Sequence, residues 1–112
     1  MIEQGDLLLV PFPFSDQSGR KKRPVIVLSN NKFNEHSEDI IVVGVTSNVS
    51  KDKYTLNLEN KDLDEGKLSV KCIIKVENIL RIDRYLVIKK IGKTKKEKLT
   101  EVIKILNEIF NP

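Results

Sequence analysis

Residues 24–29 read PVIVLS and residues 40–46 read IIVVGVT, and these two apolar stretches decide the fold. Both are rich in β-branched side chains and are too short for independent helices, so each is predicted to be a buried strand. Gly44 interrupts the second stretch, and a glycine inside a strand indicates a bulge or the close approach of another backbone segment.

The residues around these two strands alternate between apolar and polar segments. The apolar run at residues 6–10 predicts a first strand, and Pro11 and Pro13 belong at its end or at an edge, because proline donates no ladder hydrogen bond. Residues 15–22 and residues 30–39 are polar, and both are predicted to be loops.

The second half of the chain continues the strand pattern. Residues 54–59 alternate in polarity, as a strand with one solvated face does, and residues 60–67 form an acidic turn region. A further alternation at residues 70–76 predicts a fifth strand. The less regular apolar stretch that follows is expected to be a bent strand or a pair of strands ending near Gly92.

The chain ends in a predicted amphipathic helix. Thr94 and Glu97 have the spacing of a capping box. Apolar residues then recur at helical spacing, and charged residues fall mainly on the other face. The apolar stripe consists of Leu99, Val102, Ile103, Leu106, Ile109 and Phe110.

These elements predict a fold that is mainly β with a C-terminal α-helix, in one domain spanning residues 1–112. Short antiparallel strands in a chain of this length favour a compact barrel or a strongly curled sheet. The sequence has neither a βαβ alternation nor a glycine-rich phosphate loop, which argues against the nucleotide-binding α/β folds.

Composition narrows the class of protein further. The 112 residues are 39% hydrophobic and 32% charged, as in soluble globular proteins, and no apolar run approaches membrane-spanning length. The first six residues carry acid where a signal peptide would carry base, so a cytoplasmic location is expected. With one cysteine, Cys72, and one histidine, His36, the sequence predicts no disulfide, no zinc site and no cofactor. Cys72 is expected to be buried in a strand, and His36 to be an ordinary surface residue.

The formal net charge is +4, which fits a polyanionic partner. Basic residues gather at positions 20–23 and again at positions 89–98, where they are predicted to be a solvated face. Acidic residues gather at positions 59–65.

Three motifs give the sequence a family resemblance. Residues 5–16 read GDLLLVPFPFSD, residues 22–28 read KRPVIVL and residues 45–47 read VTS. This series, with Ile82-Asp83 further on and the C-terminal helix, resembles the MazF/PemK family of toxins from type II toxin–antitoxin systems. The resemblance implies an SH3-like barrel of the MazF/CcdB type and a homodimer. It also implies metal-independent cleavage of single-stranded mRNA at short sequences, and neutralisation by a cognate antitoxin.

The chemistry implied by the resemblance needs groups that stabilise charge on a phosphate. In such a reaction the 2′-hydroxyl of the RNA attacks the adjacent phosphorus atom. Arg23 matches the family's arginine, and a guanidinium can donate two parallel hydrogen bonds to phosphate. Thr46 ends the third strand, where its hydroxyl can bond the scissile phosphate. The alternatives are a solvated charge for Arg23 and a β-branched strand residue for Thr46.

The resemblance also implies roles for positions at which this sequence differs from the family pattern. Some branches have Arg-x-Asp where this sequence has Lys75 and Glu77, so Lys75 is a candidate for RNA binding and Glu77 for catalysis. For Glu77 the alternative is a solvated strand face. The remaining RNA-binding candidates are polar residues of the first loop, the basic run and the third strand's end: Ser15, Asp16, Gln17, Lys22 and Ser47. Phe12 or Phe14 can supply one stacking platform.

Two alternative functions remain open on the sequence. A toxin of the same fold can bind and poison a protein, as the CcdB branch does with DNA gyrase. The domain can also be a binding module that has lost its chemistry. The presence of Arg23 and Thr46 favours the ribonuclease, and the Lys75 and Glu77 departures keep the inactive module open.

Overall fold

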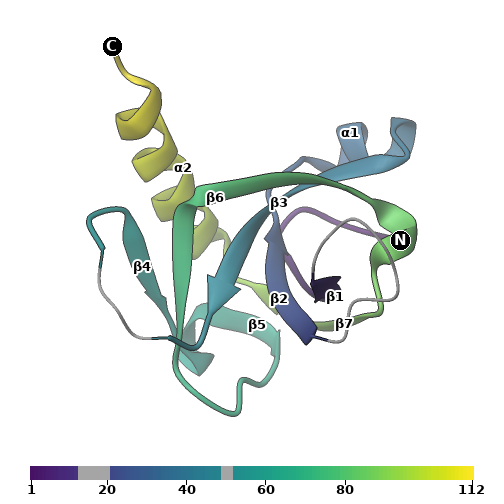
Figure 1. Ribbon diagram of the computed structural model, residues 1–112, viewed down its shortest axis with the longest axis horizontal. Coiled ribbons are helices and arrows are strands. Elements are labelled where there is room, and N and C mark those ends of the chain that lie inside the picture. Colours follow the sequence, from purple (N-terminus) through teal and green to yellow (C-terminus); the bar gives the residue numbers. More distant parts are fainter. Residues whose placement is uncertain (13–20, 49–51) are drawn as a thin grey trace.

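The computed structural model describes residues 1–12, 21–48 and 52–112. In these residues seven strands form one antiparallel sheet in the order β4-β6-β3-β2-β1-β7-β5. The sheet curls into a half-barrel, and helix α2 lies along one side of it (Figure 1). The elements are β1 (Asp6–Phe12), β2 (Lys21–Val27), α1 (Asn31–His36), β3 (Asp39–Thr46), β4 (Thr55–Leu58), η1 (Asn60–Asp62), β5 (Leu63–Gly66), β6 (Cys72–Asp83), η2 (Arg84–Leu86), β7 (Lys89–Thr94) and α2 (Lys96–Phe110), where η marks a 3-10 helix.

The curled sheet buries side chains on both of its faces. Successive residues of a strand point to opposite faces, and neighbours such as Leu7 and Leu8 accordingly belong to two different apolar clusters. The first cluster includes Leu99 and Val102 of α2, so the helix covers this face. The second cluster is closed by residues near the N-terminus, in β6 and around η2, namely Ile2, Leu80, Leu86 and Val87. A sheet with two apolar faces explains why its strands read as continuous hydrophobic runs.

The prolines of the central strands lie where a neighbouring ladder has ended. The pairing of β1 with β7 ends at Leu9, before Pro11. The pairing of β2 with β3 begins at Val25, directly after Pro24. Each proline therefore sits in a paired strand without removing a hydrogen bond from the second ladder. The edge prediction is confirmed for Pro11, whereas Pro13 lies outside the described residues.

Helix α1 corrects the prediction that residues 30–39 form a loop. The side chain of Asn30 accepts a hydrogen bond from the backbone N–H of Phe33 at 2.9 Å and so caps the helix. The amide of Asn34 is buried and donates to the carbonyl of Ser29 at 3.0 Å. These polar contacts hold a helix of six residues that has no apolar periodicity to reveal it. His36 ends the helix and is exposed, as expected.

Two predictions about the second half of the sheet need correction. The acidic turn region contains the 3-10 helix η1 and the short edge strand β5, which pairs with β7. The strand predicted at residues 70–76 is the first part of the longer β6, which continues to Asp83. The apolar stretch predicted to be a bent strand or a pair of strands contains the second part of β6 and then β7, which ends at Thr94, two residues beyond Gly92.

The capping box predicted for the last helix is absent among the described contacts. The N-cap of α2 is Lys95, and the hydroxyl of Thr94 donates to the backbone carbonyl of Gly5 at 2.8 Å. Thr94 therefore joins β7 to the start of β1. The helix itself is confirmed, but Ile103 and Phe110 of its apolar stripe are 42% and 72% exposed.

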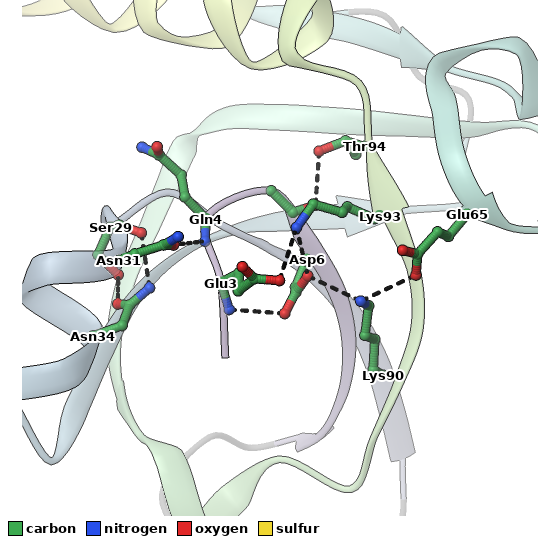
Figure 2. Close-up of polar contacts among 11 residues, drawn as sticks. Glu3, Gln4, Asp6, Ser29, Asn31, Asn34, Glu65, Lys90, Lys93 and Thr94 are labelled. Atoms are coloured by element: carbon green, nitrogen blue, oxygen red, sulfur yellow. Dashed lines mark hydrogen bonds and ion pairs between the residues drawn. The ribbon is translucent and has the colours of Figure 1, made fainter. Parts of the chain in front are cut away.

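A buried carboxylate ties the start of β1 to β7. Asp6 is 1% exposed, and its Oδ2 accepts a hydrogen bond from the backbone N–H of Glu3 at 2.9 Å. The ammonium groups of Lys90 and Lys93 lie 3.4 and 3.6 Å from Oδ1. Lys90 also pairs with Glu65 of β5 at 3.1 Å (Figure 2). These lysines hold three strands together, which corrects the prediction of a merely solvated face.

The close pairing of β5 with β7 makes Gly66 sensitive to substitution. Gly66 has a φ of +82°, and a Cβ placed there would overlap the backbone of Ile91 and Gly92. Gly66→Ala is therefore expected to lower the free energy of unfolding by about 1–2 kcal/mol, from the left-handed backbone alone. Urea denaturation beside Lys67→Ala, a substitution at an exposed neighbour, checks this. Equal stability of the two variants would contradict the expectation.

No helix in the described ranges is long and apolar enough to cross a membrane.

Candidate functional site

A pocket of about 260 Å³ lies at the common end of β2, β3 and β6, and we call it the site pocket. Three of the residues predicted from the sequence, Arg23, Thr46 and Lys75, line it together. Each comes from a different strand, so the sheet brings together groups that are far apart in the chain. The full lining is Phe12, Arg23, Pro24, Gly44, Val45, Thr46, Asn48, Lys75, Asn78 and Leu80.

Arg23 and Thr46 lie just beyond the ladder that joins β2 to β3. That antiparallel ladder ends at the pair of Val25 and Gly44. Arg23 lies two residues before Val25 and Thr46 two residues after Gly44, and two residues is the period after which side chains return to the same face. Both side chains are half-buried and both line the site pocket.

The guanidinium and the hydroxyl each have a defined environment. The Cζ atom of Arg23 lies 5.2 Å from the centroid of the Phe12 ring, within cation–π range, so the ring supports the side chain. The Oγ1 atom of Thr46 accepts a hydrogen bond from the backbone N–H of Asn48 at 3.1 Å. A hydroxyl that accepts in this way still carries a proton to donate. The pair can therefore present two kinds of donor to one anionic group.

Lys75 adds a second positive charge to the site pocket. Lys75 of β6 pairs with Gly44 of β3, and the Lys75 ammonium group lies 3.8 Å from the carboxylate of Asp52. The side chain is only 30% exposed and Asp52 is 60% exposed. An ion pair with so exposed a partner is weak, because water screens it, so Lys75 can exchange Asp52 for a phosphate.

Sequence reasoning missed Asn78, which reaches the site pocket because β6 bulges. Gly44 pairs with Lys75, but the preceding Val43 pairs with Ile79, so residues 76–78 have no partners in β3. A Cβ on Gly44 would lie 3.4 Å from the Cβ of Asn78. The bulge therefore lies close over Gly44, at ordinary van der Waals distance from where a Cβ would be. The prediction of a bulge or close approach at Gly44 is confirmed, and it was the one sequence signal for Asn78.

The remaining predicted residues are placed differently. Glu77 lies in the bulge and is exposed, and it is absent from the described lining of the site pocket. Lys22 and Ser47 line a second pocket of about 410 Å³. Ser15, Asp16 and Gln17, like Phe14, lie outside the described residues.

The second pocket is bordered by Lys21, Lys67 and the exposed Val70, and its wall includes Cys72. Cys72 is buried, as predicted, and this burial raises the pKa of its thiol. A neutral thiol is a poor nucleophile, so Cys72 acts as a packing residue. Within residues 1–12, 21–48 and 52–112, no three His, Cys, Asp or Glu side chains are grouped to hold a metal ion.

The chain matches known toxins in both sequence pattern and fold. Residues 3–110 match the model of the family described as the PemK-like, MazF-like toxin of type II toxin–antitoxin system. A MazE–MazF structure from Deinococcus radiodurans aligns with a TM-score of 0.77 and 19% identity, over 98% of this chain and 95% of that chain. The Mycobacterium tuberculosis toxin MazF-mt6 aligns with a TM-score of 0.76 and 14% identity, over 95% and 96%.

A third similar structure is an endoribonuclease in complex with its cognate antitoxin from a mycobacterial species, with a TM-score of 0.76 and 15% identity, over 100% of this chain and 98% of that chain. At these identities the structures show a shared fold, while the family match spans nearly the whole sequence. The chain belongs to the PemK-like, MazF-like family of toxins from type II toxin–antitoxin systems.

Proposed function

We propose that this toxin is a sequence-specific endoribonuclease that cleaves single-stranded RNA without a metal ion. The observation that carries the proposal is that Arg23, Thr46 and Lys75 line one pocket together. Their shared chemistry is the binding of an anionic, oxygen-rich group, and a phosphodiester is such a group.

The reaction uses the RNA's own nucleophile. The 2′-oxygen loses its proton and attacks the adjacent phosphorus atom, and the bond from phosphorus to the 5′-oxygen breaks. The products are a 2′,3′-cyclic phosphate and a 5′-hydroxyl, the latter formed when the leaving oxygen gains a proton. Arg23 and Thr46 donate hydrogen bonds to the phosphate oxygens, which carry most charge in the transition state. Lys75 strengthens the attraction for the RNA backbone.

The proposal gives Glu77 no catalytic role, because its exposed side chain is absent from the described lining of the site pocket. The proposed partners are those of the family: a cognate antitoxin and a second copy of the toxin. The similar mycobacterial endoribonuclease is named in complex with its cognate antitoxin, and the similar Deinococcus structure is named as MazE–MazF. An RNA substrate of this kind implies action in the cytoplasm.

Incubation of purified toxin with a long unstructured RNA in excess EDTA tests the function. Discrete new 5′ ends at one short sequence, each bearing a 5′-hydroxyl, are the expected result. Intact RNA from a correctly folded sample that is free of antitoxin would refute the ribonuclease. It would favour a protein-binding toxin on the same fold.

A further inference from the structure

We propose that the second pocket binds the nucleoside on one side of the scissile phosphate, while the site pocket binds the nucleoside on the other side. This inference rests on the proposed ribonuclease function and adds to it a second RNA subsite. The occupant is part of the same RNA strand that Arg23 and Thr46 hold.

The two pockets share one wall. Arg23, Pro24, Val45 and Thr46 line both of them. The site pocket is also lined by Leu80, which packs against the second apolar cluster, and the second pocket by Cys72, a member of the first. The pockets therefore adjoin each other at the start of β2 and the end of β3.

A phosphate bound at this shared wall has a nucleoside on each side. The phosphodiester joins the two, and Arg23 with Thr46 stands between the two pockets. An extended strand that crosses the wall therefore places one nucleoside over each pocket. Single-stranded RNA can do this, since its unstacked bases can be splayed apart.

The second pocket has cationic and apolar groups side by side. Lys21, Lys22 and Lys67 supply cations, and the described lining contains neither aspartate nor glutamate. Apolar side chains complete the wall and offer a surface to the flat face of a base: Leu9, Val70, Cys72 and Ile91. The volume of about 410 Å³ falls in the range of about 300–1,000 Å³ that is usual for small-ligand sites. Cations beside an apolar surface suit a nucleotide, whose phosphate is charged and whose base is apolar on its faces.

The two pockets differ in how they can read a base. Asn48 and Asn78 line the site pocket, and their amides can donate to and accept from a base edge. In the second pocket the described polar groups of Ser47 and Ser69 are accompanied by lysines. Substitutions in one pocket should therefore alter base preference on one side of the cut, and substitutions in the other pocket should alter it on the opposite side.

The test maps cleavage of an RNA pool with random bases around the cut site. Val70 is 57% exposed, so Val70→Asp brings a carboxylate to the second pocket without disturbing the core. We expect Val70→Asp to lower kcat/KM by about tenfold or more, through repulsion of the phosphate backbone, and to change base preference on one side of the cut. Asn78→Ala should change it on the other side. Ile103→Asp is the matched control: it adds the same carboxylate at an exposed apolar residue of α2 that is absent from the described lining of both pockets, and it should resemble the wild type.

Each other outcome overturns the inference in a recognisable way. An unchanged base profile and rate in Val70→Asp would show that RNA does not enter the second pocket. If poly-L-glutamate binding weakened in that same variant, the pocket would be a site for acidic peptides. If Val70→Asp instead changed the mass measured by sedimentation, the second pocket would be an interface between two copies of the chain. A wild-type protein that cleaves nothing would refute the ribonuclease itself, and the inference with it.

Discussion

Arg23→Ala is expected to slow RNA cleavage by about a hundredfold to a thousandfold, the usual effect of removing one preorganised donor to a developing oxyanion. A guanidinium matches the geometry of a phosphate, and a methyl group in its place leaves the phosphate oxygens without their principal cation. Single-turnover rates with saturating protein measure the chemical step. Expression of the variant in cells should no longer arrest growth.

Two controls separate a catalytic effect from a structural one. Arg23→Lys keeps the charge but loses the two parallel N–H groups, so it should retain partial activity. Lys104→Ala removes an exposed charge from α2 and should cleave at the wild-type rate. Loss of the contact between Arg23 and Phe12 should cost only about 0.5–1 kcal/mol of stability. Wild-type cleavage by Arg23→Ala would remove the basis of the proposed function.

Asp6→Ala is expected to lower the free energy of unfolding by about 2–3 kcal/mol, the cost of losing hydrogen bonding to a charged group. The substitution frees the backbone N–H of Glu3 and leaves Lys90 and Lys93 without their buried partner. Both lysines are partly exposed and can regain water, which limits the loss. Chemical denaturation at neutral pH measures it.

The charge state of Lys90 fixes the pH at which that experiment should be done. A hydrogen bond with Glu65 is the main factor that raises the pKa of Lys90, and Asp6 adds to it. Stabilisation by this ammonium is therefore complete below the ordinary lysine pKa and is lost as the pH rises through the raised value. Asp6→Asn keeps an acceptor for Glu3 and should lose less stability than Asp6→Ala at pH 7. Equal losses would show that the backbone hydrogen bond contributes nothing.

The sequence was sufficient for most of the sheet and for the last helix. The apolar runs at β1, β2 and β3 are long enough to have one interpretation, and the stripe that begins at Leu99 has a clear helical period. Prediction from the sequence failed for elements that are short and depend on contacts with other parts of the chain. Helix α1 rests on Asn30 and Asn34, and β5 exists because β7 pairs with it.

The site residues that could be predicted are those identified from the sequence of a single strand. Arg23 and Thr46 were candidates through the resemblance, and both line the site pocket. Asn78 was not a candidate, because its place depends on three residues of β6 that lose their partners in β3. A mismatch between two strands that pair in the sheet but are far apart in the sequence leaves little trace in the local sequence. The capping box predicted at Thr94 does not form for a related reason. The Thr94 hydroxyl donates instead to the carbonyl of Gly5, which is far away in the sequence.

The β6 bulge separates the part of the toxin that must stay constant from a part that can vary. Ladders with β3 resume on both sides of residues 76–78, so the framework is held independently of the side chains there. Val76 remains fixed by the core, whereas Glu77 and Asn78 are exposed. Randomising these two codons would therefore give a library in which most members fold. That makes the bulge a natural starting point for selecting toxins that cut new RNA sequences.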